Sequence, residues 1–144
     1  MKTLKFTLDI SPKPQRRVRH SSMGGFSRTY KDKKQVESED FLMHYLSDYV
    51  PEDPIEGAIE INMICYFGIP KSYSKKKVKL IESGELKFIK KMDNDNLEKN
   101  LWDIMTKMSF WNDDRQIYKN STEKRYAINS KPRWEIEIIY KEEL

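Results

Sequence analysis

Two short groups of acidic side chains stand out in this 144-residue chain, because their spacing could assemble a reactive site. Asp93 and Asp95 are two positions apart, and Asp113 and Asp114 follow about one helix length later. Carboxylates that a fold gathers in one place repel one another, so such a site usually holds a cation, and hard oxygen ligands suit Mg²⁺, Mn²⁺ or Ca²⁺. Lys99, one helical turn beyond Asp95, could offset negative charge that builds up on a substrate. The pattern predicts a divalent-cation site in which Asp93, Asp95 and Asp114 are candidate ligands.

Several other kinds of site do not fit the sequence. Residues 93–96 begin like a calcium-binding loop, but Leu97 and Glu98 stand where the next ligand and the glycine should be. One cysteine and two widely separated histidines do not make a zinc site. There is no catalytic serine triad, glycine-rich phosphate loop or dinucleotide fingerprint. Cys65 lies in an apolar run, which predicts a buried and inert thiol.

Hydrophobic periodicity predicts the elements that must position these side chains. Strands are expected over residues 3–10, 56–68, 116–128 and 133–140, and helices over residues 31–49 and 96–108. The lysine-rich run 71–86 fits either a loop or a short helix. The last two strands are separated by a short turn at 129–132, so they are expected to pair as a hairpin.

Asp95 also has a purely structural explanation. It stands where the N-cap of the helix over 96–108 is expected, and Glu98 follows three residues later, as in a capping box. Capping does not account for Asp93, nor for the second acidic pair. Both explanations of Asp95 remain open at the level of the sequence.

Basic residues are concentrated in two stretches, although the net charge is only +4. Residues 11–34 and 69–91 together contain 16 of the 27 Lys and Arg residues but 3 of the 23 Asp and Glu residues. Such clustering indicates a face that binds a polyanion, although two solvated surface loops would have the same composition. The first stretch has little apolar content and is expected to be a loop. The candidate phosphate contacts are Lys13, Arg16, Arg17, Arg19, Lys75, Lys76 and Lys77.

An acidic cation site in a chain with basic faces suits an enzyme that cuts nucleic acid, because a metal can supply hydroxide and stabilise the oxygens of a phosphoryl displacement. A nucleic-acid-binding module without catalysis and a globular domain with neither role remain alternatives. The chain has no long apolar segment, so no membrane span is expected. Its first residues lack the apolar region of a signal peptide, which favours a cytosolic location.

A resemblance to a known family rests on three parts of the chain. Residues 93–99 have the order Asp-x-Asp-Asn-Leu-x-Lys, Asp103 follows four residues after the lysine, and residues 111–117 have the order Trp-x-Asp-Asp-x-Gln-hydrophobic. This series resembles the RusA family of Holliday junction resolvases. The first strand, followed by Pro-Lys-Pro-Gln-Arg-Arg-Val-Arg, is similar to the opening of that family. The match is sharp over 93–117 and looser over most of the remaining chain.

The resemblance implies an α+β fold, with a small mixed β-sheet packed with two main helices in a single domain over residues 1–144. It implies a homodimer that needs Mg²⁺ or Mn²⁺ and resolves four-way DNA junctions by symmetric paired nicks, in DNA recombination and repair. By position, Asp93, Asp95 and Asp114 would bind the metal, Lys99 would be the catalytic lysine, and Asp113 would matter less.

Members of this family are often encoded by prophages, which implies a cytoplasmic protein of a bacterium or a phage. The resemblance does not exclude a branched-DNA-binding module without catalysis, nor a nuclease that acts on other branched DNA.

Overall fold

The computed structural model describes residues 1–15, 19–23, 25–90 and 92–141, without the side chains of 19–23 and 26–28. Its centre is a four-stranded mixed sheet in the order β1-β6-β4-β5. The strands of this sheet are β1 (Lys2–Leu8), β4 (Ile59–Gly68), β5 (Ile117–Ala127) and β6 (Arg133–Tyr140). The expected α+β class and mixed sheet are confirmed.

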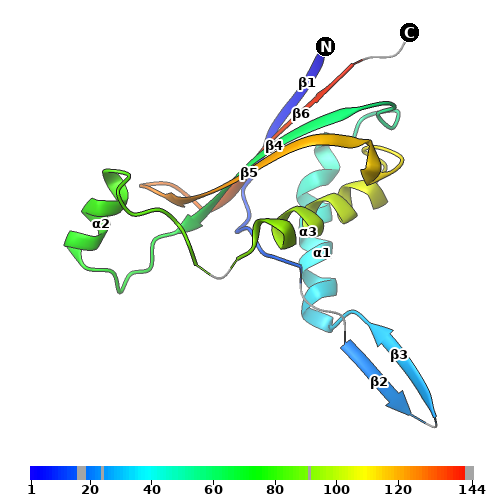
Figure 1. Cartoon of the computed structure of the whole chain (residues 1–144), viewed down its shortest axis with the longest axis horizontal. Coiled ribbons are helices and arrows are strands. Elements are labelled where there is room, and N and C mark those ends of the chain that lie inside the picture. The colour runs from blue at the N-terminus through cyan, green and yellow to red at the C-terminus, as the bar shows by residue number, and fades with distance from the viewer. Residues whose placement is uncertain (16–18, 24, 91, 142–144) are drawn as a thin grey trace.

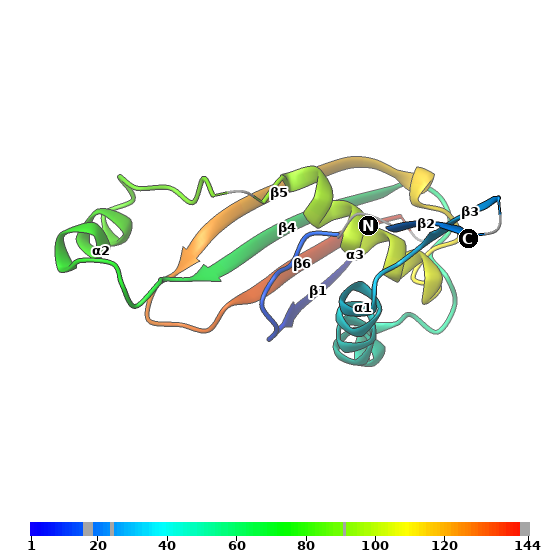
Figure 2. The same cartoon turned by 90° about the horizontal axis from the view of Figure 1, so that it is seen from below.

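The described helices are α1 (Lys33–Leu46), α2 (Lys75–Glu82) and α3 (Asn94–Lys107), with short 3-10 helices η1 (Ser47–Tyr49) and η2 (Asp114–Gln116). Helices α1 and α3 lie on the same side of the sheet, whereas α2 stands apart beyond one end of it (Figure 1 and Figure 2). The lysine-rich run therefore forms a short helix, one of its two expected states. No helix in the described ranges is long and apolar enough to span a membrane.

The expectation that the last two strands form a hairpin is wrong, because β4 lies between them. Strand β6 pairs antiparallel with both β1 and β4, and β5 pairs in parallel with β4 along the sheet edge. Burial accounts for this order: the inward side chains of β4 are all buried, whereas most of β5 is exposed. An apolar strand buries most apolar surface at the centre of a sheet, whereas a polar strand can remain in contact with water at the edge. Parallel pairing needs a long crossover, which α2 and α3 provide.

Part of the basic stretch expected to be a loop is a separate hairpin. Strands β2 (Arg19–Met23) and β3 (Phe26–Tyr30) pair antiparallel and extend away from the main sheet (Figure 1). Gly25 in the connecting turn has a φ of 82°, a conformation that glycine adopts without strain. A short glycine turn favours antiparallel pairing of its flanking residues, which the composition of the stretch did not reveal.

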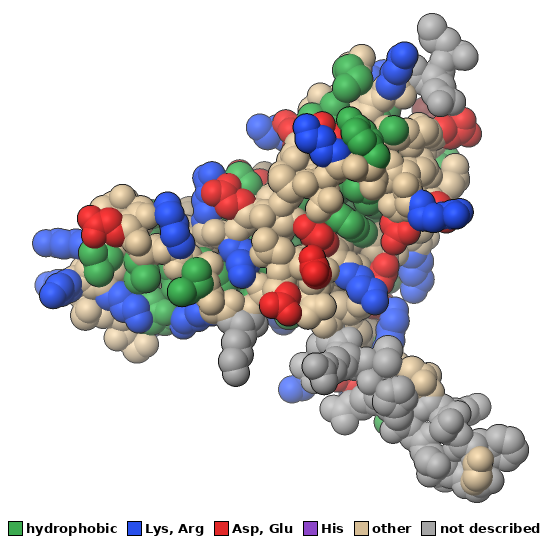
Figure 3. Space-filling model, viewed as in Figure 1, with side chains coloured by type: hydrophobic (Ala, Val, Ile, Leu, Met, Phe, Trp, Pro, Cys, Tyr) green, Lys and Arg blue, Asp and Glu red, His purple; other side chains and the backbone are tan. Residues whose placement is uncertain are grey.

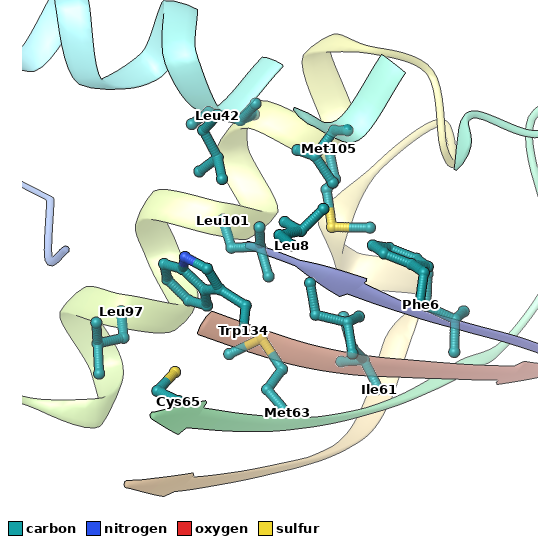
Figure 4. Close-up of a cluster of buried hydrophobic side chains, with 14 of the residues drawn as sticks. Phe6, Leu8, Leu42, Ile61, Met63, Cys65, Leu97, Leu101, Met105 and Trp134 are labelled. Atoms are coloured by element: carbon teal, nitrogen blue, oxygen red, sulfur yellow. The ribbon is translucent and has the colours of Figure 1, made fainter. Parts of the chain in front are cut away.

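The hydrophobic core fills the space between the sheet and the two helices that cover it. Figure 4 shows Trp134 and Met63 of the sheet facing Leu97 and Leu101 of α3, with Leu42 of α1 above them. All five side chains are buried. Because α3 is packed along this interface, the polar residues on its outer side have fixed positions.

Candidate active site and nucleic-acid interface

Asp93 and Asp95 lie at the start of α3, and both are exposed. Asp93 is the N-cap residue, without a side-chain cap hydrogen bond, and Asp95 lies in the first turn. The expected capping box is therefore wrong, because the helix begins earlier than predicted. Glu98 is engaged elsewhere: its Oε1 accepts hydrogen bonds from the Asn120 amide at 3.0 Å and the Thr122 hydroxyl at 2.6 Å. Both aspartates lie at the N-terminal end of the helix, where negative side chains interact favourably with the helix dipole.

The start of α3 is fixed to the edge strand β5. The side-chain amide of Asn94 donates to the carbonyl of Thr122 at 3.2 Å, and Nζ of Lys124 donates to the carbonyl of Met92 at 2.8 Å. These contacts hold the backbone on both sides of Asp93. The two exposed carboxylates are thus placed by a rigid element, as a binding or catalytic site requires.

Asp113 has a structural role. It is the N-cap of η2, and its carboxylate accepts hydrogen bonds from the backbone N–H of Arg115 at 2.8 Å and from Nε of Arg115 at 3.1 Å. The backbone hydrogen bond is the main reason that the pKa of Asp113 is lowered. Gln116 completes the capping box by accepting the backbone N–H of Asp113 at 3.0 Å, and it donates to the carbonyls of Ile55 and Gly57.

Asp114 is largely exposed, although neighbouring atoms shield part of its carboxylate from water, and other carboxylates lie near it. Partial burial raises its pKa most, followed by the hydrogen bond and charge of Asp113 and the charge of Asp103. Asp103 belongs to the later part of α3, so Asp114 lies near that end of the helix. A helix rises about 1.5 Å per residue, which places Asp103 about 12 Å along the axis from Asp95.

The predicted carboxylates are therefore divided between the two ends of α3. Asp93 and Asp95 are together at its start, and Asp114 is near its later turns. No group of three or more His, Cys, Asp or Glu side chains in the described part of the chain is arranged to hold a metal ion. One chain does not assemble the three predicted ligands around a common ion.

Lys99 links the two acidic ends along one face of α3. Residues four apart are neighbours on a helix surface, so Asp95, Lys99 and Asp103 follow one another along that face. Lys99 is exposed, as a residue that contacts a phosphate must be. The polar face of α3 therefore places the positively charged side chain of Lys99 between Asp95 and the region of Asp114.

The N-terminal basic segment is attached to α3 through residues that the sequence analysis missed. The backbone N–H of Gln15 donates to the carbonyl of Asn96 at 3.1 Å, and its Nε2 donates to Oδ2 of Asp103 at 3.0 Å. The amide of Asn100 donates to the carbonyl of Lys13 at 3.0 Å. Asn100 is only 2% exposed. In the sequence, the one sign of this attachment was Asn100 itself, an amide side chain within the apolar stripe of α3.

The predicted basic residues fall into two regions. Lys13 is exposed next to α3, whereas Arg16 and Arg17 lie outside the described residues, and Arg19 is described only as backbone in β2. Lys75, Lys76 and Lys77 are exposed in the first turn of α2. In Figure 3, Lys and Arg side chains gather around the α2 end of the molecule, and acidic side chains lie near α3.

An aromatic ring contributes to the basic α2 region. Nζ of Lys77 lies 3.9 Å from the centre of the Tyr73 ring, and Nζ of Lys90 lies 5.0 Å from it. The pKa of Tyr73 is lowered, first by a hydrogen bond with Lys90. The ring attracts both ammonium groups and holds them close together. Because Lys77 and Lys90 are exposed, they add positive charge to the surface around α2.

Two comparisons with known proteins cover most of the chain. The family model described as Endodeoxyribonuclease RusA matches residues 9–139. The chain is also 30% identical over 140 residues to the uncharacterized protein YqaN of Bacillus subtilis strain 168, and the alignment covers 96% of each chain. The family match includes β4, β5, nearly all of β6, the helix α3 and both acidic ends, and it begins just after β1.

Proposed function

Since this chain belongs to the RusA endodeoxyribonuclease family, we propose that it is a metal-dependent endonuclease that resolves four-way DNA junctions by symmetric paired nicks. The observation that supports this most is the family match over residues 9–139, which includes Asp93, Asp95, Lys99 and Asp114. On this proposal, residues 1–144 act as one RusA-like domain in DNA recombination and repair. The protein would work in the cytoplasm of a bacterium, encoded by the bacterium or by a phage.

The proposed activity needs a divalent cation, so the carboxylates of one chain were compared with the ligand set that such an ion needs. Asp93 and Asp95 offer the hard oxygen atoms that Mg²⁺ or Mn²⁺ prefers. Asp114 lies toward the other end of α3, and the described residues of one chain contain no three-residue cation site. The carboxylates of a single chain therefore do not fit the expected ion as a complete set.

A homodimer is proposed for two reasons. Two chains together supply two copies of each acidic end, so they can assemble a ligand set that one chain lacks. Two identical sites related by a two-fold axis also match the near two-fold symmetry of a four-way junction, so paired nicks follow from geometry.

The remaining side chains can bind and orient DNA. Lys99 is the cation best placed to offset charge on a phosphate near Asp95. Lys13, held against α3 through its carbonyl, lies beside this helix, and the α2 lysines extend the positive surface. Phosphate contacts position DNA without reading its sequence, so recognition would depend on branch shape.

The proposal is tested with a labelled immobile four-way junction and a matched linear duplex, each incubated with Mg²⁺ or with EDTA. Wild-type protein should nick opposed strands of the junction in Mg²⁺ only, and Asp95→Asn should abolish the nicks. Asp40→Asn, which changes an exposed carboxylate on α1, is the matched control and should cut normally. Analytical ultracentrifugation of the same samples should show a dimer.

The separation of the acidic ends supports one alternative, a branched-DNA-binding module without catalysis. Tight junction binding without cleavage in Mg²⁺ or Mn²⁺ would favour that module over the nuclease. Cutting of the linear duplex at a similar rate would instead indicate a nuclease of broader specificity.

A further inference from the structure

A pocket of about 360 Å³ opens directly beside the start of α3. It lies where the ends of β4 and β5 meet the segment after β1 and the segment between α2 and α3. Its walls include the aromatic side chains Phe67, Phe88 and Tyr126, and lysines 13 and 90 also line it. The sequence analysis did not find this pocket, because its residues come from segments far apart in the chain.

We propose that this pocket holds a nucleobase that has left the base stack of the bound DNA, next to the phosphate to be cut. This inference rests on the proposed function and adds to it a feature of the substrate. The pocket would then determine the position at which the DNA strand is cut.

The walls of the pocket suit a flat aromatic ligand. The rings of Phe67 and Phe88 are stacked with centroids 4.1 Å apart, and Tyr126 packs edge-on to Phe88 at 5.1 Å. These rings form a rigid apolar surface, and bases stack on aromatic side chains with little dependence on base identity. The volume is in the range of pockets that hold small organic ligands.

The charge at the pocket favours a nucleotide over an uncharged apolar ligand. Lys13 and Lys90 line it, and no acidic side chain is among the described residues that do so. A nucleotide combines an apolar ring with a phosphate, so it can satisfy the aromatic wall and the lysines together. A hydrophobic side chain of a protein partner would match the aromatic wall but would bring no negative charge to the two lysines.

The position of the pocket connects it to the candidate active site. Met92 lines the pocket, and Asp93 is the next residue, so their Cα atoms are about 3.8 Å apart. The hydrogen bond from Lys124 to the Met92 carbonyl, 2.8 Å long, fixes this point of the chain to β5. A base held in the pocket would therefore bring its own or its neighbour's phosphate toward Asp93 and Asp95.

Ile89 provides a means of separating the base from its neighbours. It is 83% exposed, although it lies between two pocket-lining residues, Phe88 and Lys90. Apolar side chains next to basic residues can insert between base steps and unstack them. Ile89 is placed to occupy the gap that a displaced base leaves in the stack.

Gly68 allows the pocket to be filled without disturbing the sheet. It is the last residue of β4 and lines the pocket, and a Cβ built there meets only Cγ of Pro132, at an ordinary 3.5 Å. Gly68→Leu should therefore fold and place a branched side chain in the space proposed for the base. Gly68→Ala is the matched control, because it makes the same backbone change and leaves most of the pocket open.

The test uses four-way junctions with 2-aminopurine at successive positions around the crossover, bound in EDTA so that no strand is cut. Wild-type protein and Gly68→Ala should raise the fluorescence severalfold at one position, because 2-aminopurine brightens when it leaves the stack. Gly68→Leu should lose that rise, and its junction affinity should change by less than about tenfold, since lost stacking is offset by the unstacking no longer required. Ile89→Ser should reduce the rise.

Three other results would each decide against the proposal. Junction binding without a rise at any position would overturn the pocket assignment and leave the proposed function intact. A rise that persists in Gly68→Leu, with thermal unfolding unchanged, would show that the base goes elsewhere. Absence of binding to both the junction and single-stranded DNA would overturn the proposed function, and this inference with it.

Discussion

The side-chain amide of Gln15 donates a hydrogen bond of 3.0 Å to the carboxylate of Asp103, 88 positions later in the chain. This contact attaches the segment after β1 to the helix whose start bears Asp93 and Asp95. Asp103 is also one of the charges that raise the pKa of Asp114. A single carboxylate thus contacts the basic segment and influences the second acidic end.

Gln15→Ala should weaken junction binding more than it weakens the fold. The hydrogen bond to a charged acceptor contributes on the order of 1.5 to 3 kcal/mol where it is sheltered from water, and less for this partly buried pair. The lost attachment leaves Lys13 less firmly positioned, so affinity should fall, as measured by fluorescence anisotropy with a labelled junction. Ser47→Ala removes an exposed hydrogen bond at the end of α1 and is the control. Equal affinities for the two variants would contradict the prediction.

Replacing Lys75, Lys76 and Lys77 together with alanine should reduce the salt dependence of junction binding. Each phosphate contact contributes about 0.9 to the slope of log K against log salt on duplex DNA, so three contacts predict a decrease of about 2 to 3. Affinity would be measured by anisotropy over a series of salt concentrations. Lys5→Ala, on the exposed side of β1, should leave the slope unchanged. An unaltered slope in the triple variant would exclude a phosphate role for this turn of α2.

Asp113→Asn and Asp114→Asn should change stability in opposite directions at neutral pH. The pKa of Asp114 is raised by partial burial and by Asp113, so its ionisation opposes folding as the pH rises through the acidic range. Removing that carboxylate should raise the urea midpoint at pH 7. The pKa of Asp113 is lowered by its hydrogen bond from Arg115, so its ionised form stabilises the fold and this stabilisation is lost on acidification. Asp113→Asn should lower the midpoint at pH 7. The difference for Asp114→Asn should disappear as the pH falls through the raised pKa of Asp114 to the unfolded value near 4, whereas the difference for Asp113→Asn should shrink only below that value.

Cys65 should not react with a thiol reagent until the protein unfolds. It has no exposed surface, and burial raises the pKa of its thiol to about 12. At pH 8 the folded protein should therefore show almost no release of thionitrobenzoate, and one equivalent should appear in urea. Rapid labelling of the folded protein would mean that β4 opens under native conditions.

The sequence was informative where local pattern decides the structure. Alternation predicted β1 and β4, and the apolar stripe through Leu97 and Leu101 predicted α3. The burial predicted for Cys65 is also confirmed, and its inertness stays a prediction. The two acidic pairs of the RusA resemblance lie near the two ends of α3, with Asp93 and Asp95 at its start and Asp114 near its later turns.

Two of the errors involve competition from distant partners. Glu98 satisfies the capping-box pattern, but the side chains of Asn120 and Thr122 occupy its carboxylate. The last two strands satisfy the hairpin pattern, but β4 gains more by taking the place between them. Local spacing contains no information about such partners, and for the same reason it could not reveal the pocket beside Met92.

The parallel pairing of β4 with β5 has a consequence for the order of folding. The chain between these strands contains α2, the pocket-lining Phe88 and Lys90, α3 and both acidic ends, all within one closed loop. The chain of this loop must lose conformational entropy before the contacts between the two strands can form. Strand pairings that close such long loops therefore form slowly during folding. The residues proposed for DNA cleavage should therefore reach their positions only when the sheet closes. A nascent or partly unfolded chain would accordingly have no competent nuclease site with which to damage DNA.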